Sequence, residues 1–451
     1  MMKQARKRDK ARRLLKRMFV SEEQSYEYHR PASEPLGRDV TVGDSLADSA
    51  RRFAKHMRRN SSFFRQSSVA YAISILAGLF AGIFLGHYNE MLIALPGLIV
   101  LVPAAIGMRG NIFSSLGSRL GSALHLGTVK GFSKDNHIIR SNIYSSVVLS
   151  VIFSVLLAFI ARVILLAFGI ESITLLSLVV ISFMGGIISG AILLAMTFII
   201  AFASFRRGWN PDNISSPIIT ALGDMFTIPS LLLAAFFILS FQQLVLPAAI
   251  IILVIFIACA FRMAKAGKAY FAEIVRQSSP ILFAGILLDS FAGMILQSNM
   301  ENIAMLPVVL LLIPGFLEQG GNIGNILASR LSTKLHLGAM EPKFSIEGSR
   351  EDIINSYIFS FILFPLLALL TFAAGSVIGI GGIDLVIITE SIIISGIVLT
   401  TAVIAIAFFM SIMSFRFNLD PDNTTLPLIA SSADIIGVVS LMAILRVLGV
   451  F

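Results

Sequence analysis

The sequence predicts an all-α polytopic membrane protein in which two parallel five-helix repeats are joined by a linker transmembrane helix, with about eleven crossings. Two properties of the whole chain support the membrane assignment. Only 14% of its 451 residues are charged and 56% are hydrophobic, whereas soluble domains carry about 25% charged residues. The apolar residues also fall in runs of roughly 18–30, which is long enough for a helix to cross a bilayer.

The third observation is an internal repeat. Residues 102–127 (VPAAIGMRGNIFSSLGSRLGSALHLG) match residues 313–338 (IPGFLEQGGNIGNILASRLSTKLHLG), which lie 211 positions later. Residues 210–224 (NPDNISSPIITALGD) match residues 420–434 (DPDNTTLPLIASSAD) at an offset of 210. Because the offset is almost constant over such a long stretch, the chain contains a duplicated domain rather than two chance motifs.

The apolar runs give the expected spans. In order they are 68–87, 91–124, 138–166, 173–204, 215–240, 244–261, 280–298, 302–335, 353–379, 385–413 and 424–447. The second and eighth are long, and we expect Gly110-Asn111 and Gly320-Gly321-Asn322 to interrupt them with a kink near a pore. The first five spans form a repeat at 66–241, the last five form a repeat at 278–451, and the remaining span lies in a linker at 242–277.

That unpaired span decides how the repeats are oriented. Five crossings end on the side opposite their start, so directly joined copies would be inverted, as in many secondary transporters. One extra crossing lets the second copy start on the same side, and we therefore expect a monomeric pseudo-dimer with its two-fold axis along the membrane normal. Lys and Arg concentrate in cytoplasmic loops, and their distribution here predicts a multi-pass cell-membrane protein with a cytoplasmic N-terminus and an outside C-terminus.

The formal net charge of +9 is confined to a basic cytoplasmic tail at 1–65. This tail holds 17 Lys and Arg against 8 Asp and Glu, whereas the rest of the chain holds 18 of each. It has no apolar core, which argues against a secretory signal peptide. Its charge favours binding to anionic membrane lipids over nucleic acid, and residues 46–65 predict a short amphipathic helix on the membrane surface.

Asp224 and Asp434 are the leading candidate site residues because they occupy equivalent positions within apolar helices. An acid at the centre of a membrane helix costs about 2.5–3.5 kcal/mol, so it normally faces a partner or a water-filled path. Helical spacing puts Thr220 on the same face as Asp224, and Ser431 on the same face as Asp434. Two such faces opposite each other would bind a divalent cation. The alternative is an acid bonded to the backbone or to a hydroxyl, which fits a repeated pair less well.

Other polar residues accompany this pair. Asn111 and Asn322 offer uncharged oxygens at membrane depth, although glycine-rich contacts between helices would also explain their motifs. Asp289, where the first repeat has Gly78, can add a carboxylate to the path, bind a coupling ion or be bonded locally. The copies also differ at Arg109 and Glu318. The PDN motifs can cap helices or contact a cation at the cytoplasmic mouth, through Asp212, Asn213, Asp422 and Asn423.

Cysteine and histidine contribute little to the predicted chemistry. The single cysteine, Cys259, excludes a disulfide within the chain and is expected to be a small core residue. His125 and His336 are each alone near a helix end. Since a zinc site needs three or more convergent ligands, capping or packing is the favoured role for both.

These motifs resemble a known family. The pattern P-x6-GN-x6-SRL-x4-HLG, followed by a PDN-x3-P-x6-D helix, is similar to the MgtE-type magnesium transporters, and specifically to the two-domain members that include the animal solute-carrier relatives. The resemblance covers about residues 67–447. It implies transport of divalent cations, with Mg²⁺ as the leading substrate, and it implies a place on the central ion path for Asp224 and Asp434. We expect the tail to be too short for the family's cytoplasmic magnesium-sensing domain.

The sequence thus predicts a Mg²⁺-preferring cation transporter that is not an enzyme and needs no other cofactor. The choice among Mg²⁺, Mn²⁺, Co²⁺ and Zn²⁺ stays open, although oxygen-only ligands favour Mg²⁺. Passive flow and coupling to Na⁺ or H⁺ both stay open. The rival is a membrane-embedded Mg²⁺-dependent enzyme acting on a lipid diphosphate. The strongest acids argue against it, because they lie about three helical turns from the PDN motifs at 1.5 Å per residue.

Overall fold

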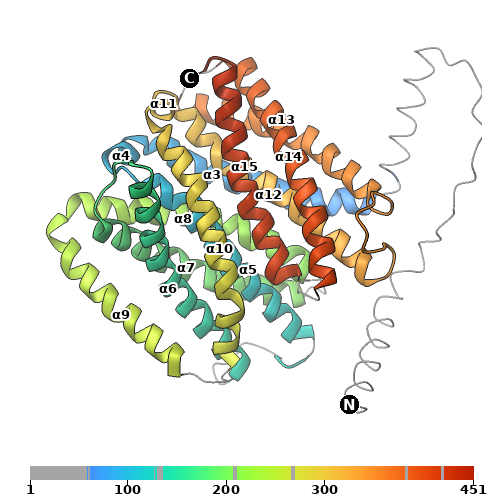
Figure 1. Ribbon diagram of the computed structural model, residues 1–451, viewed down its shortest axis with the longest axis horizontal. Helices are drawn as coiled ribbons and strands as arrows, with labels where there is room; N and C mark the ends of the chain where they lie inside the picture. The colour runs from blue at the N-terminus through green and yellow to red at the C-terminus, as the bar shows by residue number, and fades with distance from the viewer. Residues whose placement is uncertain are drawn as a thin grey trace, which may run out of the picture. The chain divides into compact units, whose positions relative to one another are not determined.

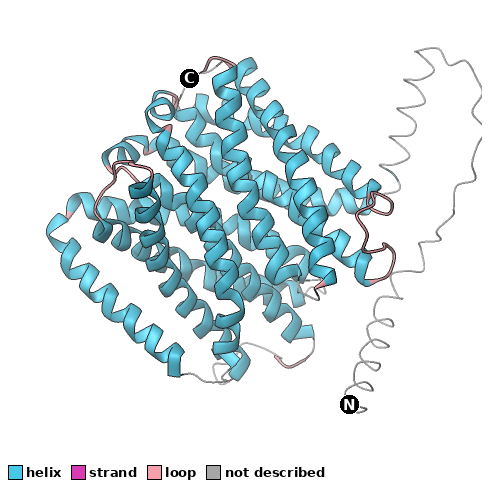
Figure 2. Ribbon diagram, viewed as in Figure 1, coloured by secondary structure: helices cyan, strands magenta, loops and turns pink. Residues whose placement is uncertain are grey.

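In the computed structural model, the described residues are 58, 61–125, 127–129, 136–206, 211–265, 270–380, 384–417 and 421–450. Side chains at 62, 66, 125, 211–217 and 421–424 lie outside this description. The chain divides into two compact units, at 1–64 and 65–451, and the fold below is that of the second unit. The expected tail and its surface helix therefore fall almost wholly outside the described residues. Every regular element within the described ranges is helical (Figure 2), as predicted.

Each repeat contains five long helices and one short one (Figure 1). In the first repeat these are α3 (Ser61–His87), α4 (Asn89–Ala94), α5 (Leu98–His125), α6 (His137–Ala167), α7 (Leu175–Arg206) and α8 (Pro211–Ser240). The linker contributes η2 (Gln242–Leu244) and α9 (Val245–Lys265). The second repeat has α10 (Tyr270–Ser298), α11 (Met300–Met305), α12 (Pro307–His336), α13 (Arg350–Ile378), α14 (Leu385–Arg416) and α15 (Pro421–Val447).

Ten helices in the described part of the chain are long and apolar enough to cross a membrane, against the eleven expected. The long helix that falls short is α12. Its centre carries Glu318, Gln319 and Asn322, which lower its hydropathy, and its residues from Val308 to Gly321 are buried by other helices. Polar groups are tolerated at membrane depth when they face protein rather than lipid.

The expected interruption at the GN motifs is wrong. Both α5 and α12 continue through Gly110-Asn111 and Gly320-Gly321-Asn322 as regular helix. The breaks lie earlier, at Leu95 (φ −123°, ψ 73°) and Leu306 (φ −131°, ψ 70°), each directly before a proline. A proline disfavours helical geometry in the preceding residue because its ring clashes with that residue's backbone. The breaks therefore separate α4 from α5 and α11 from α12.

The first long helix of each repeat packs against the other repeat. A Cβ added at Gly82 of α3 would lie 1.9 Å from the carbonyl oxygen of Leu311 on α12. At the equivalent place, a Cβ added at Gly293 of α10 would lie 2.6 Å from the carbonyl oxygen of Val100 on α5. Such close backbone contact is typical of membrane helices that meet through small residues. The two repeats are thus interlocked by an exchange of their first helices.

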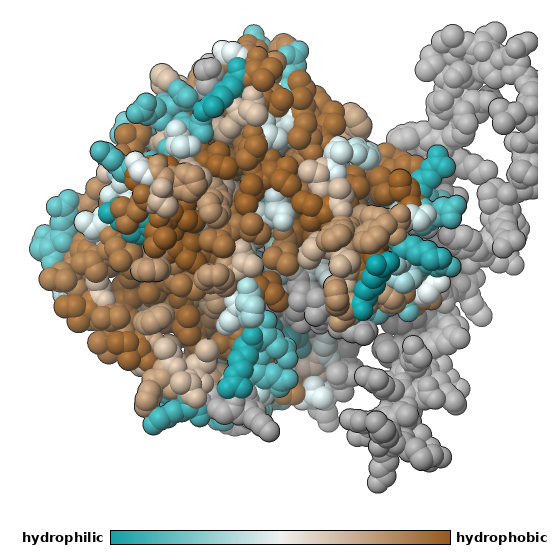
Figure 3. All heavy atoms as spheres, viewed as in Figure 1, coloured by the Kyte–Doolittle hydropathy of each residue, from teal (hydrophilic) through white to brown (hydrophobic). Residues whose placement is uncertain are grey.

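The linker helix α9 lies at the edge of the second unit and packs on α6 and α7 (Figure 1). Ala249 and Ile252 are its buried residues, and most of its other large apolar side chains are exposed. Figure 3 shows a broad apolar surface across the helices, with hydrophilic residues gathered mainly near their ends. This surface is suited to contact with lipid, because a bilayer core is apolar and its two interfaces are polar.

Candidate functional site

The two acidic helices meet the GN helices through small residues. A Cβ added at Gly223 of α8 would lie 3.7 Å from the backbone nitrogen of Gly110 on α5. In the second repeat, a Cβ added at Gly321 of α12 would lie 3.7 Å from Cα of Ala430 on α15. The glycines of the GN motifs therefore serve close helix packing.

Asp224 and Asp434 lie within α8 and α15, well inside each helix. Asp224 is buried, and its Oδ1 atom makes no hydrogen bond to another described residue. Asp434 is half-buried and lies close enough to Asp289 and Glu318 to be influenced by both negative charges. None of the described ion pairs involves these acids. The structure therefore gathers Asp434, Asp289 and Glu318, and none of the described ion pairs gives these acids a Lys or Arg.

Asp289 on α10 is fully buried at 0% exposure. Neither of its carboxylate oxygens makes a hydrogen bond of ordinary geometry with a described residue. A Cβ added at Gly107 of α5 would lie 2.4 Å from Oδ2 of Asp289, so the acid occupies the space that this glycine leaves. The hydroxyl of Ser431, on α15, lies beside the same carboxylate. The exchange of first helices thus brings Asp289 to Asp434 and Ser431.

Asn111 belongs to the same neighbourhood. A Cβ added at Gly285 of α10 would lie 3.9 Å from Asn111 Nδ2. The same Cβ would lie 3.1 Å from Ser431 Oγ. A small cleft opens next to it between α5, α6, α10 and α15, and its polar lining includes Asn111, Ser115, Arg119 and Ser278. The cleft offers a polar approach to this group of residues.

Glu318 was identified from the sequence only as a difference between the copies, and Ser74 was missed. Glu318 is buried on α12 beside Ser74 of α3. The Nδ2 atom of Asn322 donates to Ser74 Oγ at 2.7 Å and to Glu318 Oε1 at 3.5 Å, while Gln319 Nε2 donates to Ser74 Oγ at 2.9 Å. Each of these residues stands where the other repeat has a glycine at the offset of 211, Gly285 for Ser74 and Gly107 for Glu318. A residue-by-residue comparison of the repeats would therefore have identified both.

Thr220 packs against the first GN motif. It is half-buried, and its Cγ2 methyl group would lie 3.5 Å from a Cβ added at Gly110. The PDN motifs differ from the prediction, because α8 and α15 begin at Pro211 and Pro421. The Asp and Asn that follow therefore lie in the first turn and not at the cap. Side chains of Asp212, Asn213, Asp422 and Asn423 are outside the described residues.

Arg109 turns away from the acids. Its guanidinium is fully buried and donates to the carbonyl oxygens of Ala105, at 3.1 Å, and of Ser182 on α7, at 3.4 Å. The adjacent Gly110 still packs on α8. The arginine therefore leaves the contact made by the first GN motif intact.

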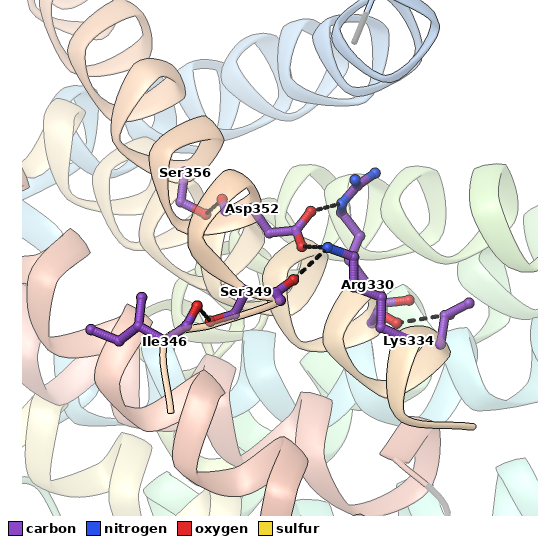
Figure 4. A network of polar contacts seen from close by, with 9 residues as sticks. Arg330, Lys334, Ile346, Ser349, Asp352 and Ser356 are labelled. Carbon is purple, nitrogen blue, oxygen red and sulfur yellow. Dashed lines mark hydrogen bonds and ion pairs between the residues drawn. The ribbon is translucent and has the colours of Figure 1, made fainter. Parts of the chain in front are cut away.

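The arginines of the two SRL motifs, Arg119 and Arg330, bond to residues of a neighbouring helix. Arg330 Nε lies 2.5 Å from Asp352 Oδ1 and Lys334 Nζ lies 2.6 Å from Asp352 Oδ2, as Figure 4 shows. In the first repeat Arg119 Nε donates to Asn142 Oδ1 at 2.7 Å. These contacts tie α12 to α13 and α5 to α6.

The donor set suits a hydrated ion better than a bare one. Across the described ranges, no three His, Cys, Asp or Glu side chains converge closely enough to hold a metal ion directly. Mg²⁺ keeps several waters and is usually bound through one or two carboxylates. His336 bonds Ser332 of its own helix and packs on Phe415, as the packing role requires. The His125 side chain lies outside the described residues, and Cys259 is only half-buried, on α9.

Comparisons with known proteins agree with this chemistry. A family model described as "MgtE: Divalent cation transporter" matches residues 102–234 and 313–444. Solute carrier family 41 member 3 of Rattus norvegicus is 25% identical over 369 residues, which cover 77% of this chain and 78% of that protein. Solute carrier family 41 member 2 of Xenopus laevis is 28% identical over 298 residues, or 60% of this chain and 51% of that protein. No solved structure is significantly similar.

Proposed function

Because the chain belongs to the MgtE family of divalent cation transporters, we propose that it carries Mg²⁺ across the membrane along a path between its two repeats. The family assignment makes it a multi-pass membrane transporter of divalent cations and not an enzyme. The alternative hypothesis of a membrane-embedded enzyme that acts on a lipid diphosphate has no support. The observation that carries the proposed path is the group of buried acids around Asp434, which has no basic partner among the described ion pairs.

The proposed path is lined by oxygen donors from both repeats. Carboxylate and amide oxygens suit hard cations such as Mg²⁺ and Mn²⁺, and we propose Mg²⁺ as the main substrate, with Mn²⁺, Co²⁺ and Zn²⁺ as secondary ones. The ion would keep most of its water, since the donors are few at any one level. The residues proposed to contact it are Asp224, Asp434, Asp289, Asn111, Asn322, Thr220 and Ser431, with Asp212, Asn213, Asp422 and Asn423 at the mouth.

The organisation we propose follows the repeats. Residues 66–241 and 278–451 form the two halves of a pseudo-dimer within one polypeptide, and 242–277 returns the chain across the membrane. The N-terminal tail lies in the cytoplasm against anionic lipid. Equivalent contacts at Gly82 and Gly293 support the pseudo-symmetry, because each pairs α3 or α10 with the opposite repeat.

Reconstituted protein tests the proposal. Proteoliposomes containing the wild type should take up Mg²⁺, and both Asp224→Ala and Asp434→Ala should abolish uptake while the detergent-solubilised proteins keep a wild-type elution profile. Glu171→Gln, which removes an exposed acid, is the matched control and should transport normally. Normal flux in both aspartate variants would overturn the proposed path, and a wild type without divalent flux would overturn the function.

A further inference from the structure

The small cleft beside Asn111 leads toward the acids of α10 and α15. Residues of α5, α6, α10 and α15 line it, so both repeats contribute to its walls. Leu282 on α10 and Pro427 on α15 are two of these residues, and each lies seven positions before the acid of its own helix, Asp289 or Asp434. Seven helical residues span about 10 Å, so two walls of the cleft lie at a similar distance from the acids.

The α5 wall distinguishes an inner from an outer end. Asn111, Ser115 and Arg119 line the cleft at intervals of four residues, which places them on one face of the helix. Asn111 marks the inner end, because it lies in the neighbourhood of Ser431, whose hydroxyl is beside the Asp289 carboxylate. Arg119 lies about 12 Å further along the helix. The cleft therefore runs inward from the side on which α10 and α15 begin.

Two aromatic rings fill the equivalent place in the other half of the molecule. Leu282 corresponds to Tyr71 of α3 at an offset of 211, and Leu149, which lines the cleft from α6, corresponds to Phe359 of α13 at an offset of 210. The rings of Tyr71 and Phe359 lie 4.7 Å apart between centroids, and both residues are buried. This separation is within the range of about 4.5–7 Å at which aromatic rings attract each other.

Building on the proposed function, we propose that hydrated divalent cations reach the acids through this cleft, and that Tyr71 and Phe359 close the pseudo-symmetric approach. Divergence of the repeats explains why the residues differ, but it does not explain why Ser115 lines the cleft where the second repeat has Ile326. Polar groups at membrane depth are tolerated when they face protein or a water-filled cavity. A polar wall in the half that is not filled by aromatic rings therefore indicates a wet approach.

The cleft is narrow in this structure. The space that it offers to water centres is about 10 Å³, which corresponds to about one water molecule. Mg²⁺ keeps several waters when proteins bind it, so the surrounding helices must separate slightly for the ion to pass.

Arg119 gives this approach a positive charge. Of the described residues that line the cleft, Arg119 alone is charged, and its Nε atom donates to the neutral Asn142 at 2.7 Å. Arg330, at the equivalent position, is instead paired with Asp352. A local positive charge slows the arrival of cations, and such effects change association rates by about 10-fold or more. Asn142→Asp supplies a balancing carboxylate, so it should lower the KM for Mg²⁺ by about 10-fold and leave the maximal rate unchanged.

Moving the aromatic pair into the cleft tests the approach directly. Leu282→Tyr with Leu149→Phe recreates the pair of Tyr71 and Phe359, and it should abolish Mg²⁺ flux in proteoliposomes while the solubilised protein keeps a wild-type elution profile. The matched control is Phe283→Tyr with Val147→Phe, which puts the same residue types on exposed faces of the same two helices. This control should transport normally.

Cysteine accessibility gives a second measurement that does not depend on folding of the double variant. In a Cys259→Ser background, Ser278→Cys at the outer end of the cleft should react with a small cationic methanethiosulfonate reagent. The reaction should block flux, and Mg²⁺ should slow it. Ser67→Cys is the matched control, since Ser67 is the equivalent of Ser278 at an offset of 211 and is buried, and flux through it should not respond to the reagent.

Wild-type flux in the double variant with the aromatic pair, or an equal response of the two cysteine variants, would overturn the cleft as the approach while leaving the transport function standing. An unchanged KM in Asn142→Asp would refute the effect assigned to the charge of Arg119. Absence of flux in the wild type would instead refute the proposed function.

Discussion

Arg330 and Arg119 occupy equivalent positions in the two repeats, but only Arg330 meets a carboxylate. Its Nε atom lies 2.5 Å from Asp352 Oδ1, and Lys334 approaches the other oxygen of that acid at 2.6 Å. Arg119 instead donates to the neutral Asn142. The second repeat therefore has an ionic tie between its second and third long helices where the first repeat has a neutral hydrogen bond.

Asp352→Ala should lower the melting temperature of the solubilised protein more than Asp352→Asn. Alanine removes the carboxylate that both cations share, whereas asparagine reproduces the Arg119–Asn142 arrangement. Both cations are partly exposed, so the loss should be about 1–2 kcal/mol, below the 3–5 kcal/mol of a fully buried pair. Glu347→Ala, in the exposed loop before α13, is the control and should melt like the wild type. Equal melting of the alanine and asparagine variants would contradict this account.

Glycine-to-alanine changes should distinguish glycines that touch the backbone of a neighbouring helix from glycines in ordinary side-chain packing. Gly82→Ala would place a methyl group 1.9 Å from the Leu311 carbonyl oxygen, and Gly293→Ala would place one 2.6 Å from that of Val100. Both should reduce the yield of folded protein, because neither helix can give way without moving its neighbour. Gly190→Ala makes only ordinary contacts, with Phe113 at 3.7 Å and Ser150 at 3.9 Å, and should be tolerated. Size-exclusion chromatography of a fluorescent fusion would measure the yields, and a normal yield for Gly82→Ala would refute the contact.

The residues around Arg109 should be replaceable, when changed together, by the equivalent residues of the second repeat. Ser154 and Ser189 correspond to Phe364 and Leu399 at an offset of 210, while Arg109 corresponds to Gly320 at 211. Arg109→Gly alone leaves a cavity, and Ser154→Phe alone overpacks the site, at roughly 2–5 and 1–3 kcal/mol respectively.

Combining Arg109→Gly, Ser154→Phe and Ser189→Leu should melt above either single variant, since it recreates the apolar layer in which Leu399 lies 2.5 Å from a Cβ added at Gly320. Differential scanning fluorimetry of the four proteins gives the comparison. Additive losses in the triple variant would show that the serines and the arginine are independent.

Magnesium should stabilise the protein through the intramembrane acids. A ligand present at 100 times its dissociation constant adds about 2.7 kcal/mol to folding stability. The melting temperature of the wild type should therefore rise with Mg²⁺, and chelation should reverse the rise. Asp434→Asn should lose this response, whereas Glu171→Gln should keep it. A Na⁺ series at matched ionic strength separates specific binding from charge screening.

Cysteine labelling should report the proposed topology. Cys259→Ser gives a background without cysteine, because the chain contains only one. Glu171→Cys should then react in intact cells with a membrane-impermeant maleimide, whereas Lys343→Cys should react only after permeabilisation. Both positions are exposed in the structure. The reverse pattern would invert the proposed orientation.

The membrane spans were predictable because long apolar runs depend on composition alone. The helix breaks at Leu95 and Leu306 were also predictable, since each precedes a proline, whereas the glycines of the GN motifs allow helices to approach each other. The partnership of Glu318 with Ser74 was not predictable from one repeat considered by itself. It depends on α3 crossing to α12, and neither hydropathy nor local spacing contains that information.

The exchange of first helices also delays one contact during biosynthesis, because α3 and its partner α12 are far apart in the sequence. Gly78, Gly82 and Gly86 form the face of α3 that meets α12, but Leu311 is synthesised 229 residues after Gly82. At about 5–20 residues per second, this glycine face waits roughly 10–50 s beside lipid before its partner leaves the ribosome. Completion of the first repeat cannot satisfy it, because its partner α12 belongs to the second repeat.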